Sequence, residues 1–136
     1  MTLIYMIDTN TVSYIINGRS KEARRQLDKH LAETVISAVT EGELRYGLAR
    51  KPEAHKLKDA VEAFLGVVKV LPWDSEAAES YGSMRAHMTA AGKSLSPLDM
   101  LIAAHAAALG ATFVTADGAF AHAEGLRARV NWARDL

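Results

Sequence analysis

Four acidic side chains stand at positions where an α/β protein commonly builds a site. Asp8 directly follows a short apolar segment near the N-terminus, and Asp117 follows a second one near the C-terminus. Glu43 and Asp99 each lie in the first turn of a predicted helix. If the strands are parallel, Asp8, Glu43 and Asp117 meet at one edge of the sheet. Asp99 is placed less firmly, because its helix does not have to begin beside a strand end.

A cluster of these carboxylates would require a positive charge. Four carboxylates in one low-dielectric cleft repel one another unless protons or a cation neutralise them. A ligand set made of oxygen alone suits Mg²⁺ or Mn²⁺ and not zinc. The chain contains no cysteine, and its five histidines lack the spacing of metal ligands. Such a cation lowers the pKa of a bound water and stabilises charge on phosphorus oxygens, which predicts phosphodiester hydrolysis.

Each of the four acids also has a purely structural explanation. A side-chain oxygen at the start of a helix commonly accepts a hydrogen bond from the backbone of the first turn. The candidate capping positions are Asp8, Asp117, and the pairs Thr40 with Glu43 and Ser96 with Asp99. Taken singly, capping explains each position at least as well as catalysis, and only the coincidence of four favours a site.

Polar residues accompany the acids at the proposed edge. They are Thr9, Asn10 and Thr115. These side chains could orient water or ligands, although turn formation explains them almost as well. His105 lies in an alanine-rich predicted helix, where packing or a hydrogen bond is a better explanation than catalysis.

The segments that must position these residues alternate between strands and helices. Predicted strands cover residues 3–7, 34–39, 67–71 and 111–115, with a final strand at 129–132. Predicted helices cover residues 11–17, 21–33, 40–49, 57–65, 75–91 and 96–109, with a short helix after Asp117. This alternation predicts right-handed crossovers. We therefore expect one three-layer α/β/α domain over residues 1–136, with a mostly parallel central sheet of four to five strands.

Composition limits the class of protein. A chain of 136 residues that is 49% hydrophobic fits a single packed domain. The absence of cysteine excludes a disulfide scaffold and suits a cytoplasmic protein. The N-terminus shows neither a basic leader nor a long apolar run, so we expect no signal peptide or membrane span. Zero net charge weakens the case for nucleic-acid binding, but without the four proposed ligands 16 basic residues face 12 acidic ones.

Four short motifs carry these acids, and together they resemble the PIN-domain family. They are residues 7–10 (IDTN), 40–47 (TEGELRYG), 96–104 (SPLDMLIAA) and 114–120 (VTADGAF). The motifs occur in the family's order and the likeness covers essentially the full chain. Within the family, the chain is similar to the VapC toxins of bacterial type II toxin–antitoxin pairs.

The resemblance implies a Mg²⁺- or Mn²⁺-dependent endoribonuclease. The family's acidic quartet falls on Asp8, Glu43, Asp99 and Asp117, and we expect the three aspartates to bind metal. Glu41 is the alternative to Glu43, since side chains two positions apart on a helix point about 200° apart and cannot face one metal equally. Periodicity leaves that choice open, and the family pattern selects Glu43. In the same family pattern, Asn10 matches the polar residue after the first acid, and Thr115 matches the hydroxyl that accompanies the last acid.

The resemblance implies partners as well. A VapB-like antitoxin would neutralise the enzyme and associate it indirectly with DNA, in a homodimer or a hetero-oligomer, with no membrane involved. Many members cut structured RNA such as transfer RNA, and residues 96–99 and 126–132 are similar to members that cut initiator transfer RNA. Apolar positions on the first helix (Val12, Ile15 and Ile16) and at 57–65 could form a groove for an antitoxin helix or a dimer contact, although core packing explains each one singly.

Two other functions stay open. The first is a catalytically silent binding partner that acts through an antitoxin–operator complex, which the four intact acids disfavour. The second is a small phosphotransfer or phosphatase domain with Asp8 as the nucleophile. The segment Asp8-Thr9-Asn10 lacks the second aspartate of the common Asp-x-Asp motif. For the favoured nuclease, attack by water predicts 3′-hydroxyl and 5′-phosphate products.

Overall fold

Five short strands form one sheet in the computed structural model, which describes residues 3–136. Met1 and Thr2, which belong to the N-terminal segment expected to carry no leader, lie outside the described residues. The strands stand in the order β3 (Lys69–Leu71), β2 (Thr34–Ser37), β1 (Tyr5–Ile7), β4 (Thr112–Val114) and β5 (Ala128–Val130). Every neighbouring pair is parallel. The predicted parallel sheet is confirmed, with five strands.

The strand order reverses at β1. From β1 the chain proceeds outward through β2 to β3, and then returns to build β4 and β5 on the opposite side of β1. In open parallel sheets, ligands bind outside the carboxyl ends of the strands at such a reversal. Asp8 directly follows β1 and Thr115 directly follows β4, so both occupy this position.

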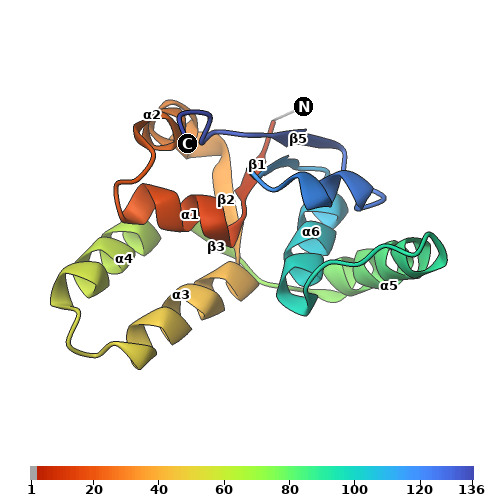
Figure 1. Cartoon of the computed structure of the whole chain (residues 1–136), viewed down its shortest axis with the longest axis horizontal. Coiled ribbons are helices and arrows are strands. Elements are labelled where there is room, and N and C mark those ends of the chain that lie inside the picture. The colour runs from red at the N-terminus through yellow and green to blue at the C-terminus, as the bar shows by residue number, and fades with distance from the viewer. Residues whose placement is uncertain (1–2) are drawn as a thin grey trace.

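Helices cover both faces of the sheet. They are α1 (Thr9–Ile16), α2 (Lys21–His30), α3 (Ala38–Arg50), α4 (His55–Val67), α5 (Ser75–Ala90) and α6 (Pro97–Leu109), with 3₁₀ turns η1 (Leu31–Glu33) and η2 (Gly118–His122). Figure 1 shows α1, α2 and α4 on one side of the strands and α5 and α6 on the other. The three-layer α/β/α arrangement is therefore confirmed. Within residues 3–136, no helix is both long and apolar enough to cross a membrane.

Two apolar cores lie on the two faces because side chains alternate along each strand. Met6 and Phe113 belong to the core beneath α5 and α6, together with Met84. Ile7 and Val114 belong to the core beneath α1, α2 and α4. The central strands are thus buried on both faces, which fixes the backbone from which Asp8 projects.

Part of the groove expected on α1 and α4 is core instead. Val12, Ile15, Val61 and Phe64 are buried in the second core. Ile16 alone among the three named positions of α1 stays partly exposed. For these buried members the alternative of ordinary core packing holds, whereas Ile16 and Leu57 stay partly exposed.

The junction between β2 and α3 also differs from the prediction. The strand ends at Ser37 and the helix begins at Ala38, whereas the sequence predicts a strand through Val39 and a helix from Thr40. The Ser37 hydroxyl accepts a hydrogen bond from the Val39 amide at 3.1 Å and caps the helix. Thr40 and Glu43 therefore lie inside α3, so the capping box expected for them is wrong and Glu43 sits in the second turn. Strand propensity at a β-branched valine was overridden by this cap.

Other boundaries shift by a few residues. The helix predicted to end at 33 ends at His30 and continues as η1, and α4 extends through Val67 into the predicted third strand. The first helix begins at Thr9, two residues earlier than predicted, because Asp8 caps it. The last strand covers 128–130 in place of 129–132.

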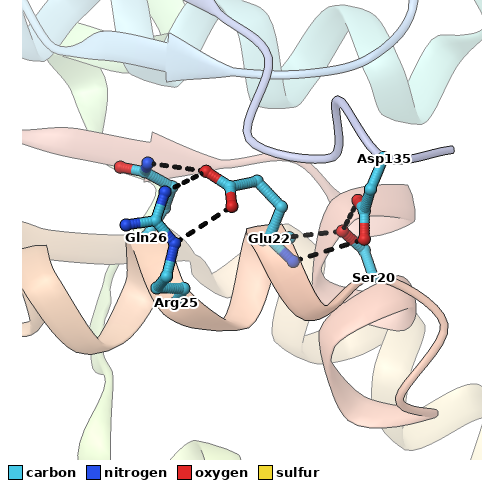
Figure 2. A network of polar contacts seen from close by, with 6 residues as sticks. Ser20, Glu22, Arg25, Gln26 and Asp135 are labelled. Carbon is cyan, nitrogen blue, oxygen red and sulfur yellow. Dashed lines mark hydrogen bonds and ion pairs between the residues drawn. The ribbon is translucent and has the colours of Figure 1, made fainter.

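The segment after β5 is fastened to α2. Its Trp132 is buried in the second core. The Ser20 hydroxyl donates to Asp135 Oδ1 at 2.6 Å, and the Glu22 amide donates to Asp135 Oδ2 at 3.3 Å, as Figure 2 shows. Ser20 Oγ also accepts from the Ala23 amide at 3.0 Å. Ser20 and Asp135 together thus accept hydrogen bonds from backbone amides in the first turn of α2, and they fasten the C-terminal segment to this helix.

Candidate active site

Asp8 is the buried carboxylate of the site. Its side chain is 3% exposed. Oδ1 accepts from the Thr11 amide at 2.9 Å, so the predicted cap is present, and Oδ2 accepts from the Thr115 hydroxyl at 2.6 Å. Burial raises the pKa of Asp8, the hydrogen bonds from Thr11 and Thr115 oppose that rise, and the negative charge of Asp99 adds to it. A buried acid beside a second acid creates a local demand for positive charge.

Thr115 connects Asp8 to Asp117. The hydroxyl that donates to Asp8 also accepts from the Asp117 amide at 3.0 Å. Thr115 is itself buried. Its hydroxyl therefore donates its proton to the Asp8 carboxylate and accepts from the Asp117 backbone. The exposed Asp117 side chain accepts from the Ala119 amide at 2.9 Å, which is the predicted cap of the short helix η2. The two aspartates after β1 and β4 are therefore tied together by one hydroxyl.

Glu43 reaches the same edge of the sheet through Thr9. The Thr9 hydroxyl donates to Glu43 Oε1 at 2.6 Å and lies 3.3 Å from the hydroxyl of the buried Thr40. Glu41 is turned elsewhere, because its Oε2 accepts from Arg45 at 2.8 Å. Of the two glutamates, Glu43 is thus the one in contact with the residue that follows Asp8.

Asp99 approaches from the start of α6. The Ser96 hydroxyl accepts from the Asp99 amide at 3.3 Å and caps the helix, as the Ser-x-x-Asp spacing predicts, with Pro97 at the first helical position. The Asp99 side chain is partly exposed. Its negative charge contributes to the raised pKa of Asp8, so the two carboxylates are close enough to repel one another.

Two other predicted positions lie apart from these contacts. Asn10 is exposed on α1, and its side chain makes no hydrogen bond within residues 3–136. His105 is 1% exposed, and its Nδ1 lies 2.8 Å from Ser37 Oγ. Burial lowers the pKa of His105, which favours the neutral ring. The packed, hydrogen-bonded histidine expected from the sequence is therefore observed.

The site meets part of what a divalent cation requires. Its donors are all oxygens, and Asp8 carries the raised pKa of an acid without a counter-ion. Among residues 3–136, however, no three acidic or histidine side chains converge closely enough to hold a metal ion in this arrangement. Asp99 is partly exposed and Asp117 is exposed, so neither side chain is locked in a packed core. The donor chemistry fits Mg²⁺ or Mn²⁺, and closure around the ion requires these side chains to rotate.

Two supporting hydroxyls were missed from the sequence. Ser37 and Thr40 are fully buried at the β2–α3 junction. Ser37 joins the start of α3 to His105 of α6, and Thr40 packs its hydroxyl against Thr9. A serine inside the predicted strand 34–39, three residues before the predicted helix, was the available signal for the first. The second depends on a contact between residues 31 positions apart, which no local pattern reveals.

Two surface hollows border the acids and differ in chemistry. The first, of about 180 Å³, lies between α1, α3 and α4, and its wall includes Glu43 beside the apolar Ile16, Leu44, Leu57 and Val61. The second, of about 210 Å³, lies between the Thr115–Gly118 turn and the Arg129–Asn131 end of β5. Glu43 therefore borders an apolar hollow, and Asp117 borders a polar, partly basic one.

Comparison with known proteins identifies the family. The PIN domain profile matches residues 5–126. The "tRNA(fMet)-specific endonuclease VapC" of Salmonella typhimurium is 32% identical over 113 residues, covering 83% of this chain and 86% of that protein. The "VapC ribonuclease Y4jK" of Sinorhizobium fredii is 33% identical over 129 residues, covering 89% and 92%.

Solved structures with the same fold are also VapBC complexes. The DNA-bound VapBC of Salmonella typhimurium superposes with a TM-score of 0.90 at 30% identity, covering 96% of this chain and 99% of that one. VapBC2 of Rickettsia felis, bound to a DNA fragment from its promoter, gives a TM-score of 0.88 at 27% identity, with the same coverage. The chain belongs to the PIN-domain family and, within it, to the VapC ribonucleases.

Proposed function

We propose that the chain is a toxin endoribonuclease whose acids at the carboxyl edge of β1 and β4 bind a divalent cation. PIN-domain nucleases are generally metal-dependent. One observation carries the proposal: the buried Asp8 lies at the reversal of strand order, beside Asp99, with Thr115 joining it to Asp117. The single five-stranded sheet supports treating residues 1–136 as one nuclease domain. An RNA substrate makes the cytoplasm the proposed compartment.

The three aspartates are the proposed ligands of Mg²⁺ or Mn²⁺. When bound, the ion neutralises charge on the phosphate oxygens and lowers the pKa of water. Thr115 holds the Asp8 carboxylate and the Asp117 backbone in fixed relation. Thr9 fixes one oxygen of Glu43, which leaves the other to position the attacking water and accept its proton.

The proposed reaction is hydrolysis of a phosphodiester bond. The water oxygen bonds to phosphorus, the bond from phosphorus to the 3′ oxygen breaks, and the 3′ oxygen takes a proton from solvent. The products are a 3′-hydroxyl and a 5′-phosphate. The rival in which Asp8 acts as a nucleophile is disfavoured, because that carboxylate is buried and both its oxygens already accept hydrogen bonds.

Transfer RNA is the proposed substrate. The Salmonella typhimurium and Shigella flexneri relatives are named tRNA(fMet)-specific endonucleases. We therefore choose an initiator transfer RNA transcript as the probe, incubated with purified protein and Mg²⁺ or Mn²⁺, with the 5′ ends of the fragments mapped by sequencing. Discrete cleavage that EDTA abolishes is expected. A 2′,3′-cyclic phosphate product would contradict the mechanism.

Glu43 and Glu41 form a matched pair for testing the site. Glu43→Gln removes the proposed proton acceptor and is expected to lower kcat by about 10² or more. Glu41→Gln removes only an exposed pair with Arg45 and is expected to cleave as the unmodified protein does. Equal loss in the two variants, or full activity in Asp99→Asn, would refute the assignment of the acids.

An antitoxin is the proposed partner, since the similar solved structures are VapBC complexes, some of them on DNA. The apolar hollow beside Glu43 offers a place where one antitoxin side chain could bury surface next to the acids. Co-expression with a neighbouring short reading frame is expected to give a stable complex, and growth arrest is expected without it. Copurification that survives Ile16→Asp would exclude this hollow as the contact.

A further inference from the structure

We propose that Arg129 binds a phosphate group of the RNA beside Asp117 and so positions the strand that is to be cut. This inference rests on the proposed nuclease function and deepens it by naming a substrate-positioning residue. The supporting features are a polar hollow that contains both side chains, a balance of charge at the site, and a rigid strand beneath Arg129.

The hollow lies directly beside the proposed acids. Its wall is formed by the turn from Thr115 to Gly118 on one side and by residues 129–131 on the other. Thr115, whose hydroxyl bonds to Asp8, and Asp117 both belong to that wall. A group bound in this space therefore lies next to the residues that would act on it.

The charge of the site requires a basic neighbour. The RNA backbone carries one negative charge per phosphate, and the proposed pocket is itself acidic. A cation held among the acids would serve the reactive phosphate group. A flanking phosphate group needs a basic side chain of its own. The hollow that contains Glu43 has no basic residue in its wall, whereas the hollow that contains Asp117 has Arg129. The guanidinium group is suited to bidentate contact with phosphate.

Arg129 is available for such a contact. It is exposed and forms no ion pair within residues 3–136. The basic residues that do form pairs lie on helices, with acids one turn away. The Arg129 guanidinium is therefore available to pair with a negatively charged ligand.

The backbone beneath Arg129 is fixed. Arg129 pairs with Phe113 in the parallel register of β4 and β5, and the Thr115 amide donates to the Val130 carbonyl at 2.9 Å. These contacts hold the end of β5 against the turn that carries Asp117. A positioning residue on a strand is held more accurately than one on a free loop.

Arg127 provides a matched control. It lies two positions before Arg129, at the residue that directly precedes β5. Its guanidinium, however, lies 3.5 Å from the Gly110 carbonyl, at the amino end of β4 and away from the acids. Replacing either arginine with glutamine removes one positive charge, and Arg127→Gln also removes the long contact with the Gly110 carbonyl.

The test measures cleavage of the initiator transfer RNA transcript by the full chain and by Arg129→Gln, Arg129→Lys and Arg127→Gln at several salt concentrations. Arg129→Gln is expected to raise KM about tenfold with kcat unchanged, as for a lost charged hydrogen bond. The slope of log(kcat/KM) against log[salt] is expected to become shallower by about 0.7 to 0.9, which corresponds to one phosphate contact. Arg129→Lys should recover most of the loss, and Arg127→Gln should match the unmodified protein.

Binding without turnover separates this inference from the proposed function. The same RNA is titrated by fluorescence anisotropy against Asp99→Asn protein, with and without Arg129→Gln or Arg127→Gln. Equal dissociation constants for the two glutamine variants would overturn the inference, and so would a loss of kcat at unchanged KM. Failure of the unmodified protein to cleave RNA would instead overturn the nuclease proposal. Equal melting temperatures of the variants would exclude misfolding as the cause.

Discussion

The carboxylate of Asp8 combines burial, two hydrogen bonds and a neighbouring negative charge. Its pKa is raised, so the folded chain binds this proton more tightly than the unfolded chain does. The stability that depends on this proton is present at low pH and is lost as the pH rises through the raised pKa. Once ionised, Asp8 therefore weakens the fold, a cost that a functional carboxylate commonly carries.

Asp8→Asn tests that statement. An asparagine keeps an oxygen for the Thr11 amide and removes the charge, so the variant is expected to melt at a higher temperature than the unmodified protein at pH 7. The difference should shrink as the pH falls into the ordinary carboxyl range, while cleavage is lost at every pH. Thermal melts from pH 4 to 8 measure this. Asp117→Asn, at an exposed position, is the control and should change the melting temperature little.

Thr115 gives a second prediction at the scale of single residues. Thr115→Val keeps the shape of the side chain but removes the hydroxyl that joins Asp8 to Asp117. Groups that orient metal ligands typically affect activity 10- to 100-fold, so kcat/KM for RNA is expected to fall by roughly that factor. Thr115→Ser retains the hydroxyl and should restore most of the activity. A valine variant as active as the unmodified protein would show that this hydroxyl has no positioning role.

At the scale of elements, the junction of β2 and α3 is held by one serine. Ser37 caps α3 and also contacts the buried ring of His105 on α6. Ser37→Ala removes the cap and leaves a buried ring nitrogen without its partner, so the free energy of unfolding is expected to fall by about 1–3 kcal/mol. Urea unfolding measures the change. Ser83→Ala, on the exposed face of α5, should stay within about 0.5 kcal/mol of the unmodified protein.

The elements also show which parts of the structure a sequence can predict. The alternation of strands and helices and the caps at Asp8, Ser96 and Asp117 depend on neighbouring residues, and these predictions are confirmed. The start of α3 was misplaced because Val39 favours a strand, while the decisive Ser37 also contacts His105, 68 positions away. The strand order and the contacts from Thr115 to Asp8 and from Thr9 to Glu43 are long-range, so local patterns do not contain them.

At the scale of the whole molecule, metal binding should be visible as stability. An ion that binds only the folded state stabilises it by about 2.7 kcal/mol at a concentration 100 times its dissociation constant. We therefore expect millimolar Mg²⁺ or Mn²⁺ to raise the melting temperature of the unmodified protein by several degrees and EDTA to reverse the rise. Asp99→Asn should respond less. The same shift in both proteins would indicate binding of the ion outside the proposed site.

The position of β1 at the centre of the sheet also affects how the protein is made. The ribosome synthesises the strand that carries Asp8 first, but the hydroxyl that anchors this carboxylate comes from Thr115, 107 positions later. Until β4 has emerged, β1 lacks a neighbour on one side, and the pocket has neither Thr115 nor Asp117. A nascent chain interrupted within α6 therefore contains Asp8, Glu43 and Asp99 without an assembled catalytic centre. We therefore expect a chain whose synthesis has not reached β4 to be inactive toward RNA.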